Sequence, residues 1–246
     1  MKARLVTLFL NHKKNDCIGL QCCHKTELRV VLPFIFLWSR AVLELQNLEA
    51  WRDDRCLYQA LSLTLHSGQV GQILGPNGVG KTTLLKQIAG LNRSMTGNIR
   101  WQAEAVSDDT QRFQREVLFL GHLSGLKSAL TVAENLQCLS ACRGNRLDTE
   151  RLDFALGRVG LSGYDDVPVA QLSAGQKRRV ALARLFTESP VLWLLDEPFT
   201  AIDQGGVAEL EGWLADHVEQ GGIVLLTTHH RLQLRCPITP IELIPA

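Results

Sequence analysis

The chain lacks a strong net charge and any apolar segment long enough to cross a membrane. Its 246 residues include 26 Lys and Arg against 25 Asp and Glu, a formal net charge of +1. This balance argues against a broad nucleic-acid-binding surface, which needs a clear positive excess. No apolar run reaches the roughly 18 residues that a membrane-spanning helix requires. Repeats and low-complexity tracts are also absent, so we expect one large globular domain or two small ones.

The cysteine spacing excludes two kinds of cofactor site. Cys22, Cys23 and His24 are adjacent, whereas covalent haem attachment requires the spacing C-x-x-C-H. Cys138 and Cys142 are four residues apart, and two thiols without a second pair of ligands do not make a zinc site. We therefore expect reduced cysteines and no covalently bound haem.

Residues 1–41 differ in composition from the rest of the chain. They carry seven Lys or Arg residues against two acidic ones, and three of the seven cysteines. The apolar stretch VVLPFIFLW is interrupted by Pro33 and lacks the small-residue cleavage site of a signal peptide. Two interpretations stay open. The segment is either a non-native extension, with translation beginning at Val42, or a membrane-surface anchor formed by Phe34, Phe36 and Trp38 beside basic residues.

From residue 42 onward, predicted strands alternate with predicted helices. Residues 43–65 show the pattern of short strands, and QVGQILG predicts a strand that leads into a glycine-rich loop and a helix. Buried strands are predicted in REVLFLGH, PVLWLLDEP and GGIVLLTTH. This alternation favours a mostly parallel sheet with helices on both faces. A helical block at about 124–170 interrupts it as an inserted subdomain would, and Pro237 and Pro240 predict an irregular end.

The segment GPNGVGKT fits the phosphate-loop pattern G-x-x-x-x-G-K-[ST]. Glycines let the backbone N–H groups wrap closely around phosphate oxygens, and the following helix presents its positive end to them. In this pattern Lys81 reaches the β- and γ-phosphates, and the Thr82 hydroxyl binds Mg²⁺. The predicted ATP-binding residues of the loop are Gly75, Pro76, Asn77, Gly78, Val79, Gly80, Lys81, Thr82 and Thr83.

Two further apolar segments end in polar residues that suit phosphate chemistry. Asp196 and Glu197 follow VLWLL, and ligands of open α/β sheets bind beyond the carboxyl ends of the strands. We predict that Asp196 holds the Mg²⁺ shell and that Glu197 orients or deprotonates the attacking water. His229, at the end of IVLLTTHH, is predicted to donate a hydrogen bond to the γ-phosphate or to hold that water.

The segment QLSAGQKRRVALAR combines a helix start with two small residues. Ser173 and Gln176 have the spacing of a capping box. Capping alone does not require Ala174 and Gly175 in the first turn, so we expect this turn to approach another group closely.

Taken together, the motifs resemble those of ABC transporter nucleotide-binding subunits. GPNGVGKTT, LSAGQ, LLDEP, AID and TTH occur in the family's order over about 42–235. The resemblance implies a P-loop NTPase fold over 42–240, with a RecA-like core, an N-terminal antiparallel β subdomain and the inserted helical subdomain. Ala174 replaces the usual first glycine of the signature motif, and Thr200-Ala201-Ile202-Asp203 replaces the usual S-A-L-D.

The resemblance also implies a homodimer in which two copies enclose ATP head to tail. The signature residues that would meet the partner's ATP are Ser173, Ala174, Gly175 and Gln176. His122 stands where the family usually has a glutamine near Mg²⁺, and we assign it that role as a metal ligand. For the residue that stacks on adenine, Trp51 is the nearest aromatic candidate, with Arg52 as the alternative by spacing.

Three stretches narrow the resemblance: GHLSGLKSALTVAENL, VPVAQLSAGQKRRVALARL and LWLLDEPFTAID. They are similar to the ATP-binding subunit of the bacterial haem exporter of cytochrome c maturation, the CcmA family. That likeness implies an ATPase that uses ATP and Mg²⁺ and is peripheral on the cytoplasmic face of the inner membrane. It also implies an integral, CcmB-like membrane subunit as partner and a role in haem export or release of a haem-carrying intermediate.

Other functions stay open. The ATPase subunit of an exporter for another substrate has the same motifs. A soluble ABC ATPase acting on the ribosome or DNA commonly carries two ATPase units or long coiled-coil insertions, and this chain has neither. A small-molecule kinase would not need LSAGQ, and a non-hydrolysing binding module would not need Glu197. We expect no nucleic-acid partner.

Overall fold

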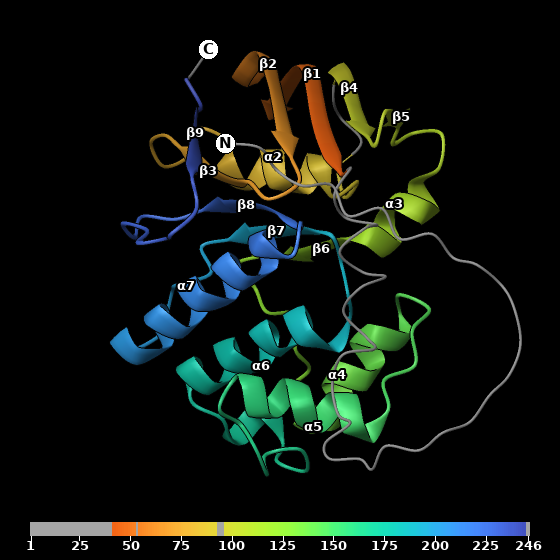
Figure 1. Ribbon diagram of the computed structural model, residues 1–246, viewed down its shortest axis with the longest axis vertical. Helices are drawn as coiled ribbons and strands as arrows, with labels where there is room; N and C mark the ends of the chain where they lie inside the picture. The colour runs from red at the N-terminus through yellow and green to blue at the C-terminus, as the bar shows by residue number, and fades with distance from the viewer. Residues whose placement is uncertain (1–40, 53, 93–95, 245–246) are drawn as a thin grey trace, which may run out of the picture.

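A computed structural model describes residues 41–52, 54–92 and 96–244. The predicted extension 1–41 therefore lies outside the described residues, apart from Ala41, which is buried. Two β-sheets and a helical layer make up the described part of the chain (Figure 1). No helix among the described residues has both the length and the apolarity to span a bilayer.

The first sheet is antiparallel, with strand order β2-β1-β4-β5. Its strands are β1 (Val42–Arg52), β2 (Arg55–His66), β4 (Thr96–Trp101) and β5 (Glu104–Ala105). The segment predicted as short strands is thus one long hairpin, interrupted by register shifts between Leu45 and Leu48. This bulge keeps Leu48 on the buried face of Leu45, although an odd residue spacing would otherwise turn it outward.

The second sheet is parallel, with strand order β6-β7-β8-β3-β9. Its strands are β6 (Val117–Leu120), β7 (Leu192–Asp196), β8 (Ile223–Thr227), β3 (Val70–Leu74) and β9 (Ile238–Glu242). The irregular end predicted from Pro237 and Pro240 was wrong, because β9 pairs with β3 over this segment. An edge strand tolerates Pro240, since the N–H that proline lacks is not needed on the open side.

The two central strands supply side chains to two separate cores. Leu192 and Leu194 of β7 face the antiparallel sheet, whereas Trp193 and Leu195 face the helical layer. Strand β8 alternates in the same way. Because both faces are covered, these strands read as continuous apolar runs, as buried parallel strands do.

Helices cover both faces of the parallel sheet, as predicted. Helix α2 (Lys81–Ile88) lies between the two sheets, and α3 (Thr110–Glu116) precedes β6 (Figure 1). The other face carries α4 (Val132–Ala141), α5 (Thr149–Arg158), the 3-10 turn η1 (Val169–Gln171), α6 (Ala174–Thr187) and α7 (Gln204–Glu219). Helices α4 and α5 pack against α6 and fall inside the predicted insert of about 124–170. The division into a domain over 42–240 and this insert stays a prediction.

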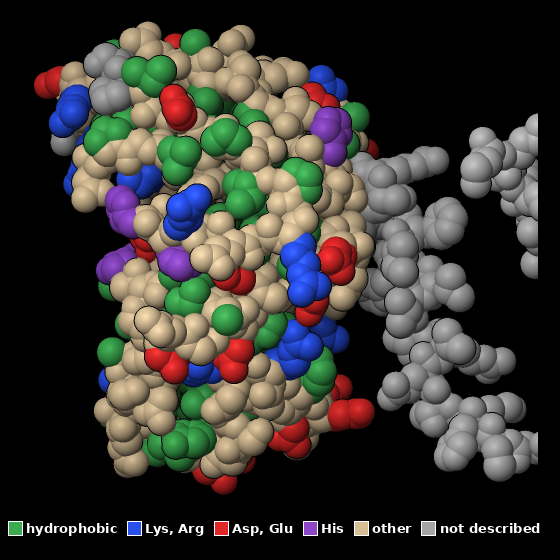
Figure 2. All heavy atoms as spheres, turned by 60° about the vertical axis from the view of Figure 1, so that its left-hand side comes forward, with side chains coloured by type: hydrophobic (Ala, Val, Ile, Leu, Met, Phe, Trp, Pro, Cys, Tyr) green, Lys and Arg blue, Asp and Glu red, His purple; other side chains and the backbone are tan. Residues whose placement is uncertain are grey.

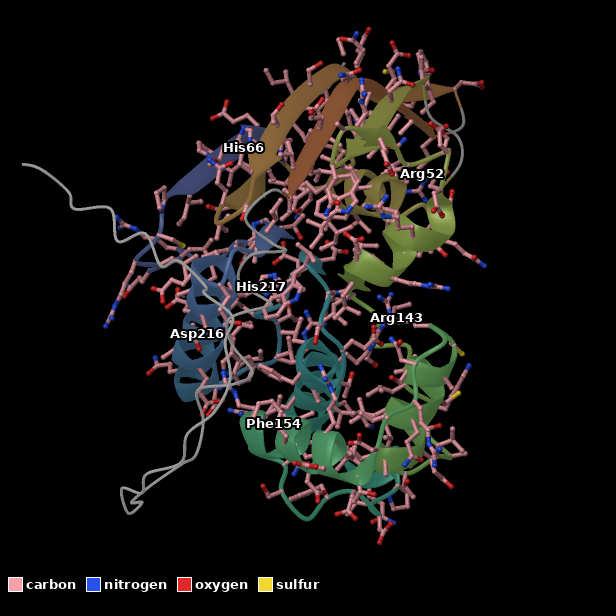
Figure 3. The ribbon with its side chains drawn as sticks, turned by 45° about the vertical axis from the view of Figure 1, so that its right-hand side comes forward. Arg52, His66, Arg143, Phe154, Asp216 and His217 are labelled. Atoms are coloured by element: carbon pink, nitrogen blue, oxygen red, sulfur yellow. The ribbon has the colours of Figure 1, made fainter. Side chains whose placement is uncertain are left out.

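A buried histidine joins α7 to the sheet. The His217 ring stacks on Trp193 with ring centroids 3.8 Å apart, and its Nε2 lies 3.1 Å from the carbonyl oxygen of Val191. Its neighbour Asp216 turns outward, with its carboxylate 3.6 Å from the Arg158 guanidinium (Figure 3). Burial lowers the pKa of His217 to about 4, so the ring is neutral at pH 7.

Candidate active site

The glycine-rich loop joins β3 to α2 and needs its glycines. Gly75, Gly78 and Gly80 have φ values of 141°, 81° and 109°, in the region that L side chains rarely adopt. A Cβ added at Gly75 would lie 2.8 Å from the carbonyl oxygen of Leu243 in the segment after β9. Gly80 is the N-cap of α2 and offers no side-chain cap. The first amides of α2 are therefore left for an anion.

Lys81 lies over this loop. Its Nζ donates hydrogen bonds to the carbonyl oxygens of Gly75 at 2.7 Å and Pro76 at 3.3 Å. Weak carbonyl acceptors hold the ammonium beside the open amides, where a phosphate would attract it more strongly. Lysine and backbone amides thus converge on one point, as the sequence motif predicts.

Asp196 ends β7 beside the first turn of α2. The Thr82 hydroxyl donates to its Oδ2 at 2.8 Å, and the Thr227 hydroxyl donates to its Oδ1 at 2.8 Å. A hydroxyl and a carboxylate side by side are the hard oxygen ligands that Mg²⁺ prefers, together with substrate phosphates. No group of three or more His, Cys, Asp or Glu that would hold a metal occurs among the described residues. The Thr82 hydroxyl and the Asp196 carboxylate fit a metal whose remaining ligands come from a nucleotide.

Glu197, the next residue, has a strained backbone and a buried carboxylate oxygen. Its φ is 47°, which is uncommon for a residue other than glycine. Its N–H donates to Thr227 Oγ1 at 3.0 Å. Its Oε1 is buried and accepts no hydrogen bond from the described residues, while His229 Nε2 lies 3.6 Å away. A carboxylate oxygen in this position is suited to accept a proton or orient a water.

These groups line one cavity of about 390 Å³. The predicted residues that line it are Asn77, Gly78, Gly80, Lys81, Thr82, Thr83, Asp196, Glu197 and His229. The side chains of Arg52, Leu57 and Thr200 complete the lining. Histidine side chains gather at a hollow in one edge of the molecule, next to acidic and basic groups (Figure 2). The structure therefore brings together motifs that lie more than a hundred residues apart in the chain.

Three predicted loop positions lie outside that lining. Gly75 and Pro76 hold Lys81 through their carbonyl groups, and Val79 is buried in the core. Their contribution is to the shape of the loop. The glycine pattern could not separate residues that face the cavity from residues that support it.

Trp51 and Arg52 point in different directions at the end of β1. Successive side chains of a strand alternate between its faces. Trp51 is 51% exposed and does not line the cavity, whereas Arg52 does. Arg52 also lines an adjoining recess with Asp54, Arg55, Leu57 and Gly78. The geometry favours the alternative, Arg52, over Trp51 as the residue beside a bound base.

His122 is not brought to the metal-binding atoms. It is exposed just beyond β6 and does not line the cavity. The preceding residue, Gly121, is fixed by its carbonyl oxygen, which accepts a hydrogen bond from the Arg178 guanidinium at 3.3 Å. In this structure, therefore, only Thr82 and Asp196 of the three predicted ligands lie together.

The Ser173 turn does not line the cavity of its own chain, and its predicted role at the ATP of a second copy stays a prediction. The capping box is confirmed: Gln176 N–H donates to Ser173 Oγ at 3.2 Å, and Ser173 N–H donates to Gln176 Oε1 at 2.9 Å. Ser173 and Ala174 are exposed. A Cβ added at Gly175 would lie 3.1 Å from the carbonyl oxygen of Ala201, so the close packing of this chain already favours glycine there.

Two residues with direct contacts to the site were not predicted from the sequence. Thr227 ties Asp196 to the Glu197 amide, and Arg178 binds the Glu197 carbonyl oxygen. A weak signal existed for both. Thr227 ends an otherwise apolar strand, and Arg178 is the middle residue of the basic run Lys177-Arg178-Arg179 at the start of α6.

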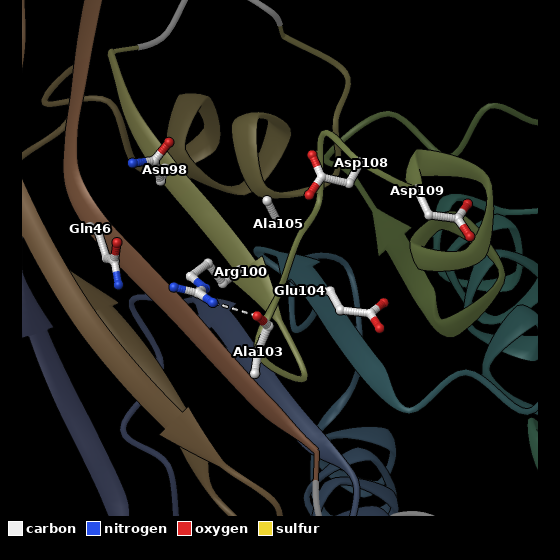
Figure 4. A pocket seen from close by; sticks show the side chains of 8 residues that line it. All are labelled: Gln46, Asn98, Arg100, Ala103, Glu104, Ala105, Asp108 and Asp109. Carbon is white, nitrogen blue, oxygen red and sulfur yellow. Dashed lines mark hydrogen bonds between the residues drawn. The ribbon is translucent and has the colours of Figure 1, made fainter.

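A second cavity, of about 530 Å³, lies on the antiparallel sheet (Figure 4). Its lining residues are Gln46, Asn98, Arg100, Ala103, Glu104, Ala105, Asp108 and Asp109. Arg100 is engaged there, because one of its terminal NH₂ groups donates to the carbonyl oxygen of Ala103 at 2.5 Å. Three carboxylates would repel a triphosphate. The first cavity is therefore the candidate nucleotide site.

Comparisons with known proteins agree with this geometry. The sequence pattern of the ABC transporter family matches residues 58–200. The cytochrome c biogenesis ATP-binding export protein CcmA of Vibrio cholerae is 51% identical over 188 residues, 76% of this chain and 91% of that protein. The protein of the same name from Hahella chejuensis is 49% identical over 202 residues, 82% of this chain and 95% of that protein.

Solved structures show the same fold. A structure described as an ABC transporter ATP-binding protein from Pyrococcus furiosus superposes with a TM-score of 0.71 and 24% identity. The match covers 82% of this chain and 97% of that one. The predicted fold class, with its parallel core sheet, antiparallel β subdomain and helices, is thereby confirmed.

Proposed function

The chain belongs to the ABC transporter family and, within it, to the CcmA group, and from this premise we propose that it hydrolyses ATP to energise a membrane partner in c-type cytochrome biogenesis. The observation that carries the proposal is the cavity between the glycine loop and the Glu197 carboxylate. It joins a phosphate-binding surface to a buried oxygen without a hydrogen-bond donor among the described residues.

In this proposal the triphosphate lies along the glycine loop and the first turn of α2. Lys81 exchanges its carbonyl acceptors for the β- and γ-phosphate oxygens, which form stronger charge-assisted hydrogen bonds. Mg²⁺, held by Thr82 and Asp196, would neutralise the charge of these phosphates. Glu197 Oε1 then accepts a hydrogen bond from the attacking water, and His229 donates to the γ-phosphate.

The Ser173 turn acts in trans in this proposal. Ser173 and Ala174 are exposed and do not line the cavity of their own chain. A second copy, placed head to tail, would bring its Ser173, Ala174 and Gly175 to the γ-phosphate. The positive end of α6 and the small side chains favour close approach of an anion.

The proposal also includes an integral membrane subunit as the partner of this chain. The names of the relatives describe export proteins of cytochrome c biogenesis, which supports a CcmB-like integral subunit and a haem-related substrate. On the same basis we propose that the chain is a peripheral subunit at the cytoplasmic face of the inner membrane. Identification of the membrane protein that copurifies with the full chain tests this point.

The decisive experiment uses Glu197→Gln. This variant keeps the shape of the side chain but loses the base, so it should bind ATP, hydrolyse it on the order of a hundred- to ten-thousandfold more slowly, and accumulate as a dimer. Light scattering after gel filtration with Mg²⁺ and either ATP or ADP measures the assembly. Glu150→Gln, which changes an exposed acid of α5, is the matched control.

Two results would contradict the proposal. One is undiminished hydrolysis in Glu197→Gln. The other is a nucleotide-saturated Glu197→Gln protein that stays monomeric, because a complete site would then exist within one chain.

A further inference from the structure

Among the described residues, the hydrogen bonds of the buried Arg178 guanidinium all go to backbone carbonyl groups around the site. The residue is 7% exposed and lies on α6, about one turn beyond Ser173. Its terminal NH₂ groups donate to the carbonyl oxygens of Glu197 at 2.7 Å, Asp196 at 3.3 Å and Gly121 at 3.3 Å. Its Nε donates to the carbonyl oxygen of Pro198 at 3.1 Å. One side chain thus connects α6, the end of β6 and the three residues around Glu197.

The charge of Arg178 suits this location. Burial lowers the pKa of its guanidinium, while the Asp196 and Glu197 carboxylates oppose that shift by favouring the cation. A planar guanidinium directs several N–H groups at once toward acceptors that lie in different directions. A lysine ammonium could not reach all four carbonyl groups from one point. The geometry therefore requires arginine rather than any cation.

Arg178 binds a residue, Glu197, whose backbone is strained. Glu197 has a φ of 47°, a conformation that persists only where its surroundings fix it. Thr227 Oγ1 accepts the N–H of Glu197, and Arg178 donates to its carbonyl oxygen. Loss of either hydrogen bond would let the Glu197 backbone relax toward a negative φ. That rotation would turn the carboxylate away from the phosphate cavity.

We propose that Arg178 is a positioning residue for hydrolysis, which holds the Glu197 backbone in the left-handed conformation that aims the carboxylate at the phosphate cavity. The inference rests on the proposed ATPase function and adds a residue that acts through Glu197. Because Arg178 belongs to the same helix as the Ser173 turn, α6 links the turn offered to a partner's nucleotide with the catalytic carboxylate of its own chain.

The test compares two arginines of α6. Arg178→Lys keeps the charge but not the four hydrogen bonds, and it should lower kcat on the order of ten- to a hundredfold, the effect of misplacing a reacting group by about 1 Å. The KM for ATP should change by no more than about threefold, since the glycine loop is untouched. Arg184→Lys alters a second, half-buried arginine of the same helix that lies close to Glu188 and does not line the cavity, and it should leave kcat unchanged.

A double-variant cycle distinguishes positioning from general damage. If Arg178 acts through the Glu197 carboxylate, Arg178→Lys should have little further effect on the residual rate of Glu197→Gln. Thr227→Val should lower kcat as Arg178→Lys does, and Thr227→Ser, which keeps the hydroxyl, should restore it. These comparisons hold for variants that melt within a few degrees of the parent chain, measured by thermal unfolding.

Three outcomes would overturn the inference: an unchanged kcat in Arg178→Lys, an equal loss in Arg184→Lys, or full additivity with Glu197→Gln. They differ from failure of the proposed function. Wild-type hydrolysis that does not depend on Glu197 refutes the proposed function itself. Glu197-dependent hydrolysis that survives Arg178→Lys refutes only the positioning role.

Discussion

Helices α2 and α6 both begin at a glycine-containing motif, but their first turns are built differently. The α2 turn follows Gly80, which has no side chain to cap the helix and a φ of 109°. The α6 turn is closed by Ser173 and Gln176, each of which satisfies an amide of the other. One helix end leaves its amides for a ligand, whereas the other is already stabilised by its own residues.

The difference indicates two roles for the same helix-end chemistry. An uncapped turn is unstable unless an anion or its surroundings compensate, so α2 is suited to bind phosphate continuously within its own chain. A capped turn is stable without a ligand, so the start of α6 tolerates exposure to solvent. The capping box leaves the Ala174 and Gly175 amides without an acceptor inside the helix, and in the proposed dimer they would face the partner's nucleotide.

The largest effect should come from the open turn. Lys81→Ala removes the one ammonium beside the α2 amides, and ATP hydrolysis should fall on the order of a hundred- to a thousandfold, with weaker nucleotide binding. Binding of a fluorescent ATP analogue and phosphate release measure both effects. Lys86→Ala, which changes an exposed lysine in the last turn of α2, should leave both unchanged. If the two variants bound and hydrolysed ATP equally well, the start of α2 would have no role in phosphate binding.

A smaller effect should come from the capped turn. Ser173→Ala should cost about 1 kcal/mol of stability by loss of the cap, and also lower hydrolysis about tenfold if the turn contacts the partner's ATP. The chain offers a matched control in α4, where Thr131 and Glu134 form a second capping box. Thr131→Ala should cost similar stability at unchanged activity. If both caps reduce activity alike, the Ser173 turn contributes only to folding.

The smallest expected effect is the pH dependence of stability that His217 causes. It limits the pH range in which the variants of α2 and α6 should be compared. His217 has a pKa of about 4 in the fold and about 6.5 when unfolded. The unfolded chain therefore binds the proton more tightly, and stability falls as pH drops below about 6.5 until it levels off below about 4. At pH 5.5 the loss should be about 1 kcal/mol. Urea unfolding at pH 7.5 and 5.5 measures this loss, and His217→Phe should reduce the difference between the two values.

Much of the fold follows from local patterns in the sequence. Buried strands such as Leu192–Asp196 are continuous apolar runs, and Asp148 and Thr131 cap their helices as their spacing predicts. The strand Ile238–Glu242 could not be predicted in the same way. Two prolines flank or interrupt it, and its pairing depends on the open edge of β3, which lies far away in the sequence.

The residues of the site divide in the same way, into those predicted from contiguous motifs and those that only the fold brings together. The phosphate loop, Asp196 and Glu197 were predictable because their chemistry is carried by contiguous residues. Arg52, the alternative that spacing offered beside adenine, and Leu57 line the cavity because the antiparallel sheet lies over α2. Thr200 lines it from the segment just after β7. Arg178 and Thr227 hold Glu197 from two other elements, a relation that no spacing in one segment encodes.

Strand β9 supports the phosphate loop although it lies far from it in the sequence. Its backbone pairs with β3, the Leu243 N–H donates to the Leu74 carbonyl oxygen at 2.9 Å, and the Leu243 carbonyl oxygen lies where a side chain at Gly75 would be. The shape of the glycine loop therefore depends on a segment far along the chain, and the nucleotide site is complete only when β9 has docked against β3.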